Sequence, residues 1–474
     1  MGFLRPGIHV HLVGIGGIGL SAIARVLHGQ GYGVSGSDLQ PSALTQELVR
    51  EGITVRSGHR AAWVQGADLV IASSAVPQEN PELVEAARLG IPVVTREEIL
   101  PDLTSGHITI AVAGAHGKTT TSAMIAWILM HAGLDPTFIV GGVLLNLGTN
   151  ARAGRGPHFV IEADEYDRAF LGLHPHVAVI TTLEHDHPDC YPTFREMRAA
   201  FSDFAHQLRP GGLLIVCGED PETRRLGEIL ADGGRRVETY GLDSGWNWWA
   251  QGAEPGNSAQ FEVRRHGSEE GNTAVQNGTR LGTCALQLPG SHNLLNALGA
   301  LAASAEVGVD FGTAAAALTL FRGTARRFEV KGQSNSITVV DDYAHHPTEV
   351  QATLAAAQMK YPGRTTWAVF QPHTYSRTAM LLDAFAGAFC LADHVVVTGI
   401  YPARETDTLD VSGADIVERM EHPDAQYAET LEDAVQVLLQ RIKPGDIVIT
   451  LGAGDGYLIG ERLLAELEGR ETCQ

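Results

Sequence analysis

The segment GAHGKTTT at residues 114–121 constrains the fold of this chain more than any other. It directly follows an apolar stretch, ITIAVA, and directly precedes another, SAMIAWILMHAG. A glycine-rich loop between a strand and a helix turns backbone N–H groups toward phosphate oxygens, and the helix N-terminus adds partial positive charge. The segment therefore predicts an α/β nucleotide-binding domain in which Lys118 reaches the terminal phosphates and the Thr119 hydroxyl is offered to Mg²⁺. Its two glycines, Gly114 and Gly117, lie closer together than in the common form of this loop.

Acidic residues follow two further apolar stretches in the same part of the chain. HFVIEADEYD ends in Glu162, Asp164 and Glu165, and carboxylates at the carboxyl end of a strand beside a phosphate loop are placed to bind Mg²⁺. VAVITTLEHDHPDCY ends in a polar cluster of metal-ligating or hydrogen-bonding candidates, namely His185, Asp186, His187 and Asp189. A His-x-His pattern by itself is more often structural or only weakly metal-binding, so the second cluster needs the context of the first.

Short apolar stretches alternate with longer amphipathic ones over nearly the whole chain, which is the pattern of parallel α/β sheets. At 474 residues the chain is too long for one core. We expect three consecutive α/β domains with mostly parallel sheets: a Rossmann-like domain at 1–104, a central phosphate-loop domain at 105–328 and a second Rossmann-like domain at 329–474. Lys331–Ser336 is expected to be a polar linker. Residues 243–283, with Trp246, Trp248 and Trp249, are expected to form a β excursion, with ligand stacking as the alternative.

The net charge limits the classes of binding partner, and the cysteine pattern indicates the cellular compartment. The chain has 55 acidic and 34 basic residues, a formal net charge of −21, which disfavours nucleic acid and anionic membranes as partners. Its five cysteines are scattered without a C-x-x-C pair, so a disulfide framework is not expected. No apolar run of membrane-spanning length occurs. These features predict a cytoplasmic protein.

A second glycine motif, VHLVGIGGIGLSAIA, lies near the N-terminus. Gly14, Gly16 and Gly19 sit between a strand and a helix, and Asp38 follows at the distance typical of dinucleotide-binding domains. Considered alone, the motif makes an NAD-dependent oxidoreductase the alternative function. A loop of this kind binds a diphosphate, however, and a UDP-sugar also carries one.

Together these motifs resemble those of the Mur ligases, which add amino acids during peptidoglycan synthesis. The resemblance runs in order through GIGGIGLSAIA, SGSD, SSAV, GAHGKTTT, EADEYD, EHDHPDCY, GSHNLLNA, GTARRFE, DDYAHHPTEV, QPHTYSRT and LGAGD, and the shortened phosphate loop is the family's own form. Several members carry a carbamylated lysine between two metal ions. RAAFSDFAHQL, the matching stretch here, has no lysine, as in the branch that adds L-alanine to UDP-N-acetylmuramate.

The resemblance implies roles for residues at matching positions. The ATP site would comprise Gly114, Ala115, His116, Gly117, Lys118, Thr119, Thr120, Asn293, Arg327 and Asp342, with Mg²⁺ on Thr119, Glu162 and His187. The UDP-sugar site would comprise Gly14, Gly16, Gly17, Gly19, Ser21, Asp38, Ser73 and Ser74. The binding site for the amino-acid substrate would comprise Tyr343, His345, His373 and Arg377. The catalytic residues would be Lys118, His187, Arg327 and His345.

The chemistry implied is amide formation through an acyl phosphate, with ATP and Mg²⁺ as cofactors. The amine must lose a proton in the second step, and the candidate bases are His345, His346 or solvent. A ligase of the same family that recycles whole murein peptides is a further alternative. We expect a monomer or a weak homodimer.

Overall fold

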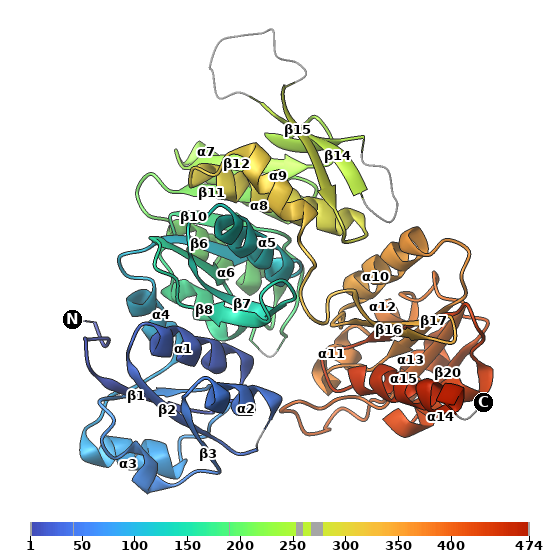
Figure 1. Ribbon diagram of the computed structural model, residues 1–474, viewed down its shortest axis with the longest axis horizontal. Helices are drawn as coiled ribbons and strands as arrows, with labels where there is room; N and C mark the ends of the chain where they lie inside the picture. Colours follow the sequence, from blue (N-terminus) through green and yellow to red (C-terminus); the bar gives the residue numbers. More distant parts are fainter. Residues whose placement is uncertain (1, 41, 189, 253–258, 267–277, 473–474) are drawn as a thin grey trace.

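Three sheets of mainly parallel strands, covered by helices, organise the chain (Figure 1). The computed structural model describes residues 2–40, 42–188, 190–252, 259–266 and 278–472. The N-terminal sheet has five strands, the middle sheet ten and the C-terminal sheet six. The prediction of three α/β domains is confirmed. Within the described residues, no helix is long and apolar enough to cross a membrane.

The N-terminal sheet has the order β3-β2-β1-β4-β5, and all its strands are parallel. Alternate residues of β1 point to opposite faces, so Val10 and Leu12 pack with α1 while Val13 packs against Leu83 of α3. The elements are β1 (His9–Val13), α1 (Ile18–Gly29), β2 (Gly33–Asp38), α2 (Ala43–Arg50), β3 (Thr54–Ser57), η1 (Ala61–Val64), β4 (Leu69–Ala72), α3 (Pro81–Leu89), β5 (Val93–Val94) and α4 (Arg96–Leu103).

The middle sheet places β6 between β9 and β10, and both neighbours run parallel to it. The carboxyl ends of these three strands therefore lie together, as ligand binding in an α/β sheet requires. The elements are β6 (Ile108–Ala113), α5 (Lys118–His131), β7 (Thr137–Leu144), β8 (Thr149–Arg152), β9 (His158–Glu162), η2 (Tyr166–Gly172), β10 (Val177–Ile180), α6 (Phe194–His206), β11 (Leu213–Cys217), α7 (Pro221–Asp232), β12 (Arg236–Gly241), β13 (Trp248–Gln251), β14 (Ala259–Arg265), β15 (Thr279–Leu286), α8 (Ser291–Glu306) and α9 (Phe311–Thr319).

The tryptophan-rich segment extends this sheet through β13, β14 and β15, which confirms the β excursion for the residues described (Figure 1). Trp248 and Trp249 are both buried. The Trp248 indole N–H also donates to Glu238 Oε2 at 2.6 Å, so this side chain serves the fold. Residues 253–258 and 267–277 of the segment lie outside the described part of the chain.

The C-terminal sheet has the order β16-β17-β21-β18-β19-β20. The expected linker at Lys331–Ser336 is wrong, because most of it lies in the edge strand β16, which pairs antiparallel with β17. Asn335 and Ser336 both have positive φ and form the tight hairpin turn, and the polar residues suit an exposed edge. The elements are β16 (Glu329–Ser334), β17 (Ile337–Asp342), α10 (Pro347–Lys360), β18 (Thr366–Phe370), α11 (Tyr375–Met380), α12 (Leu382–Ala386), β19 (His394–Thr398), α13 (Gly413–Arg419), β20 (Ala425–Ala428), α14 (Leu431–Arg441), β21 (Ile447–Leu451) and α15 (Tyr457–Thr472).

The N-terminal and middle domains share one apolar core. Ile99, Leu100 and Leu103 of α4 belong to the same buried cluster as Phe170 and Leu173 of the middle domain. Two polar contacts add to it. Arg25 Nη1 donates to Asn150 Oδ1 at 2.7 Å, and Arg96 Nη1 to Asp164 Oδ2 at 2.8 Å. The second contact ties the N-terminal domain to the acidic segment beside the phosphate loop.

Candidate active site

The phosphate loop connects β6 to α5, and two of its glycines are required by its geometry. Gly114 and Gly117 have φ angles of +135° and +81°, which side chains other than glycine rarely adopt. A Cβ atom on Gly114 would overlap the Thr181 hydroxyl, and one on Gly117 would overlap Asn296 Oδ1. The close spacing of the two glycines thus produces a compact loop held between β10 and α8.

Lys118 begins α5 and bends its ammonium group back over the loop. Its Nζ donates to Gly114 O at 2.5 Å and to Glu165 Oε1 at 2.8 Å. Burial would lower the pKa of Lys118, but the carboxylates of Glu165, Asp164 and Glu162 outweigh burial and raise it. The lysine is therefore a fixed positive charge at the mouth of the phosphate loop.

Two of the residues predicted to bind Mg²⁺, Thr119 and Glu162, present hard oxygen ligands beside this loop. Thr119 Oγ1 donates to Glu162 Oε1 at 3.2 Å, and the other Glu162 oxygen accepts from Gly141 N at 2.7 Å. Glu165 Oε2 is buried and has no hydrogen-bond partner within the described residues. A hydroxyl, carboxylates and an unpartnered buried oxygen suit Mg²⁺, so the residues present fit this ion.

His187 lies next to these carboxylates. Its Nε2 is 3.7 Å from Glu165 Oε1 and 3.7 Å from Asp186 Oδ2. The backbone of His187 has a φ of +54°, a strained conformation that clusters at functional sites. Asp189, the last candidate of this motif, lies outside the described residues.

A cavity of about 180 Å³ opens beside the phosphate loop, between the middle and C-terminal domains. Most of the residues predicted to bind ATP line it, namely His116, Gly117, Thr119, Thr120, Asn293, Arg327 and Asp342. Leu288, Leu295 and Phe328 add an apolar wall that suits a planar base. Burial raises the pKa of Asp342 to about 6, and its two oxygens accept from Phe328 N and Ala344 N, both at 2.8 Å.

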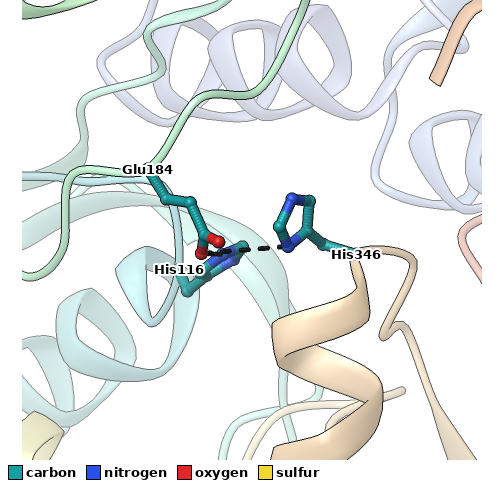
Figure 2. Close-up of side chains that lie close together, drawn as sticks. All are labelled: His116, Glu184 and His346. Carbon is teal, nitrogen blue, oxygen red and sulfur yellow. Dashed lines mark hydrogen bonds and ion pairs between the residues drawn. The ribbon is translucent and has the colours of Figure 1, made fainter. Parts of the chain in front are cut away.

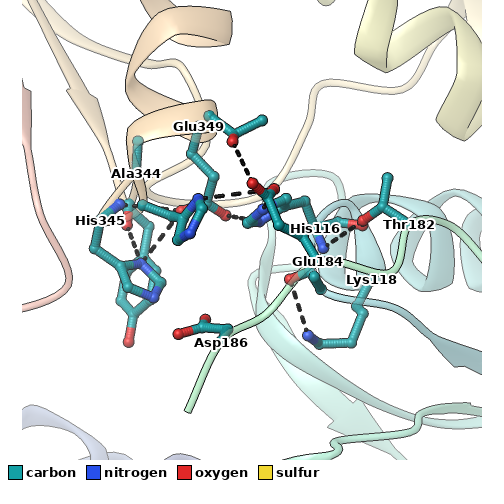
Figure 3. Close-up of polar contacts among 12 residues, drawn as sticks. His116, Lys118, Thr182, Glu184, Asp186, Ala344, His345 and Glu349 are labelled. Carbon is teal, nitrogen blue, oxygen red and sulfur yellow. Dashed lines mark hydrogen bonds and ion pairs between the residues drawn. The ribbon is translucent and has the colours of Figure 1, made fainter. Parts of the chain in front are cut away.

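His116, in the middle of the phosphate loop, links two domains through carboxylates. Its Nε2 bonds Glu184 at 2.9 Å, and its Nδ1 bonds Glu349 of α10 at 3.1 Å (Figure 2, Figure 3). Burial would lower the pKa of His116, but the two hydrogen-bonded carboxylates raise it to about 9. Glu349 also lies 3.5 Å from Arg327 Nη1 and accepts from His345 N at 3.0 Å. Glu349 is therefore the point at which the phosphate loop meets the C-terminal domain.

This raised pKa predicts that the contribution of His116 to stability depends on pH. A pKa raised from 6.5 to about 9 gives stabilisation that is complete below pH 6.5 and lost as pH rises through 9. Between pH 6.5 and 10, the free energy of unfolding of the wild-type protein should fall by on the order of 3 kcal/mol more than that of His116→Gln. Denaturant unfolding of both proteins in EDTA, which keeps metal ions from the histidine, measures this difference. If the unfolding free energies of the two proteins changed in parallel with pH, the ion pairs of His116 with Glu184 and Glu349 would be contradicted.

The residues predicted for the amino-acid side form one cluster. The rings of Tyr343 and His345 are 5.3 Å apart, and those of His345 and His373 are 5.7 Å apart. Arg377 Nη1 lies 3.1 Å from His373 Nδ1. Burial lowers the pKa of His345 to about 3 and that of His373 to about 4, so both rings are neutral near pH 7.

Arg377 also reaches back to the middle domain. Its Nε and Nη2 donate to Asp186 Oδ1 at 3.0 and 2.7 Å, and both side chains are 5% exposed. Burial would raise the pKa of Asp186, but the charges of His187 and Arg377 hold it far below its usual value. The segment expected to hold metal ligands thus supplies an ion pair between domains.

The residues predicted for the UDP-sugar lie at the carboxyl edge of the N-terminal sheet, after β1, β2 and β4. Gly14, Gly16, Gly17 and Gly19 form the turn into α1 and its first residues. Asp38 is the last residue of β2, and Ser73 and Ser74 follow β4. Asp38 Oδ2 accepts from Gly16 N at 2.8 Å and so supports the loop. Ser21 is buried in α1, where its hydroxyl donates to Ile18 O at 3.0 Å.

Models of known protein families match each domain in turn. Residues 9–107 match the Mur ligase family catalytic domain, 112–304 the Mur ligase middle domain, and 326–454 the Mur ligase glutamate ligase domain. The chain belongs to the Mur ligase family. The N-terminal glycine loop is thus part of a Mur ligase domain, and the dehydrogenase alternative is set aside.

Individual Mur ligases resemble the chain over nearly its full length. A UDP-N-acetylmuramate–L-alanine ligase of Roseiflexus castenholzii is 42% identical, with 97% of this chain and 98% of that protein covered. The structure of a UDP-N-acetylmuramate–alanine ligase from Thermotoga maritima superimposes with a TM-score of 0.81 at 30% identity, covering 98% and 100% of the two chains. A murein peptide ligase from Psychrobacter arcticus gives a TM-score of 0.69 at 29% identity, covering 97% and 99%.

Two acidic residues of this Mur ligase site were missed from the sequence. Glu184 and Glu349 hold His116 between them. Both lie inside motifs that carry the family resemblance, EHDHPDCY and DDYAHHPTEV, but the sequence assigned neither of them a role. The sequence signal that could have identified them is their position next to predicted strands and histidines. Glu184 follows β10 directly before the His-x-His pair, and Glu349 lies in the first turn of α10 after two histidines.

Proposed function

We propose that the interdomain cavity and the neighbouring histidine–arginine cluster carry out the two half-reactions of amide formation. The chain is an ATP-dependent ligase that joins L-alanine to UDP-N-acetylmuramate in peptidoglycan synthesis. One observation supports assigning ATP to the cavity and the amino acid to the histidine–arginine cluster. The ATP cavity is walled by the phosphate loop on one side and by α10 on the other, and α10 follows Tyr343 and His345. The cytoplasmic location and the oligomeric state remain predictions.

In the first half-reaction, an oxygen of the muramyl carboxylate bonds to the γ-phosphorus of ATP while the bond to the bridging oxygen breaks and ADP leaves. Two anions approach each other, so the residues must supply positive charge. Lys118 and Arg327 face this region, and both carry fixed charge when buried beside carboxylates. Thr119, Glu162 and His187 would hold Mg²⁺, which neutralises phosphate charge when bound.

In the second half-reaction, the neutral amine of L-alanine attacks the acyl carbon, and phosphate leaves with its bonding electrons. Arg377 and His373, whose side chains lie 3.1 Å apart, would hold the α-carboxylate of the amino acid. His345, with a pKa of about 3, orients the amine as a hydrogen-bond acceptor and is too weak a base to carry its proton near pH 7. The proton therefore leaves to solvent or phosphate.

This assignment predicts that His345 leaves no inflection near pH 6.5. The pH profiles of kcat/KM for L-alanine should have the same shape in wild type and His345→Asn between pH 5 and 8, with the variant lower by about 10²-fold. The measurement is phosphate release across that pH range. An inflection near pH 6.5 that disappears in His345→Asn would identify the histidine as the base.

The function is tested by phosphate release with single substrates omitted. Release should require UDP-N-acetylmuramate, Mg-ATP and a small amino acid together, and L-alanine, glycine and L-serine should be compared. Release that is indifferent to the UDP-sugar would refute the assignment. Higher kcat/KM with a murein tripeptide than with L-alanine would instead favour a recycling ligase.

A further inference from the structure

His346 is a buried histidine whose ring makes no hydrogen bond to the described residues. It precedes α10 as the N-cap residue and is 3% exposed, and neither ring nitrogen has a hydrogen-bond partner within the described residues. A buried polar group left unpaired costs free energy, so its position calls for an explanation. Burial and the nearby charge of His116 lower the pKa of His346, which leaves a neutral imidazole with a free lone pair.

Two potential metal ligands lie beside this ring. Glu184 Oε2 is 3.8 Å from His346 Nδ1 and 2.9 Å from His116 Nε2, and the three ligand atoms all lie within 4.8 Å of one another (Figure 2). Ligand atoms at 2.0–2.1 Å from a tetrahedral zinc ion are about 3.4 Å apart. The observed separations bracket that distance, so rotations of the side chains would suffice to complete the geometry.

The groups behind these ligands are those that support a metal site. His116 Nδ1, the ring nitrogen facing away from the cluster, bonds Glu349 at 3.1 Å. Glu184 Oε1, the oxygen not turned to the histidines, accepts from Thr348 Oγ1 at 3.0 Å. A carboxylate on the far nitrogen of a ligating histidine fixes the tautomer and the ring orientation. The 41% exposure of the Glu184 side chain provides an entry path for an ion.

We propose that His116, Glu184 and His346 bind a transition-metal ion of the zinc class, at a site separate from the magnesium ligands. Two imidazoles and one carboxylate are ligands that suit zinc rather than Mg²⁺, which prefers oxygen. Metal binding at His116 Nε2 displaces the proton that this nitrogen donates to Glu184, whereas the Nδ1 proton stays on the bond to Glu349, so about one proton is released per ion. Three protein ligands leave a fourth position for water or a phosphate oxygen.

The site joins two domains. His116 and Glu184 belong to the middle domain, whereas His346 precedes α10 of the C-terminal domain. A bound ion would fasten α10 to the phosphate loop and hold the two domains together. Zinc is therefore expected to slow a reaction cycle that needs the domains to separate for product release.

The test uses the full-length protein, stripped with EDTA and free of nucleotide, and titrated with Co²⁺ and then with Zn²⁺. We expect one ion per chain with micromolar or tighter affinity, a visible cobalt spectrum of tetrahedral intensity, and no displacement by millimolar Mg²⁺. His346→Ala and Glu184→Gln should each weaken binding by at least about tenfold. His394→Ala, which removes a histidine paired with Asp424 on the surface, is the matched control and should bind as wild type does.

Either of two results would overturn the proposal. One is the absence of cobalt or zinc binding below millimolar concentration. The other is binding that is unchanged in both His346→Ala and Glu184→Gln, which would place the ion elsewhere. Both variants should be folded by circular dichroism, because neither removes an apolar side chain from the core.

Discussion

Replacing Lys118 with alanine will lower the rate of phosphate release by about 10³-fold, because the phosphate loop loses its fixed positive charge. The UDP-sugar is predicted to bind in the N-terminal domain, so its affinity should change little. Steady-state phosphate release and calorimetric titration with UDP-N-acetylmuramate measure the two effects. Unchanged turnover would remove Lys118 from the catalytic residues.

The Lys118 substitution also leaves the buried Glu165 carboxylate without its cation, so a control for this loss is needed. The Glu165 side chain is 1% exposed and pairs with Lys118 at 2.8 Å, so the alanine variant leaves a buried carboxylate without its cation. The double variant Lys118→Ala, Glu165→Gln removes that charge. It should regain stability without regaining activity. Lys331→Ala, at a partly exposed lysine of the C-terminal domain, controls for the loss of a lysine and should remain active.

Replacing Arg377 with alanine will lower kcat/KM for L-alanine by at least about 10²-fold. The guanidinium is buried with Asp186, and breaking a buried pair by removing one partner costs about 3–5 kcal/mol. Each 1.4 kcal/mol corresponds to about tenfold in an equilibrium constant, so domain docking suffers together with amino-acid binding. Initial rates at varied L-alanine and the unfolding transition of the C-terminal domain measure the two losses.

Two controls separate these roles of Arg377. Adding Asp186→Asn to Arg377→Ala neutralises the stranded carboxylate, so stability should recover while affinity for L-alanine stays low. Recovery of both would mean that Arg377 acts only in docking. Arg419→Ala in the same domain breaks an exposed pair with Asp383, which should cost less than about 1 kcal/mol and leave the kinetics intact.

The fold could be predicted from the sequence because strands buried on both faces of a parallel sheet are short apolar runs. Ile108–Ala113 and Val177–Ile180 are of this kind. The edge strand β16 was misassigned because one face of an edge strand is solvated and its residues resemble a linker. Apolar periodicity therefore finds central strands better than edge strands.

The site could be predicted where local geometry is encoded in adjacent residues, as in the glycines of the phosphate loop. Its ion pairs could not, because their partners come from different domains. His116 and Glu349 are 233 positions apart, and Asp186 and Arg377 are 191 positions apart. Nothing in the local sequence shows which carboxylate faces which cation once the domains pack.

The shared core of the first two domains has a consequence for how the molecule moves. α4 is embedded in the apolar cluster of the middle domain. The described contacts that tie the phosphate loop and the His187 segment to the C-terminal domain are mainly hydrogen bonds and ion pairs of His116, Glu184 and Asp186, with a ring contact between His116 and His346. Water can replace polar contacts at little cost, but separating an apolar core exposes it. We therefore predict that the first two domains move as one rigid unit and that the C-terminal domain, which is predicted to bind the amino acid, moves relative to them during turnover.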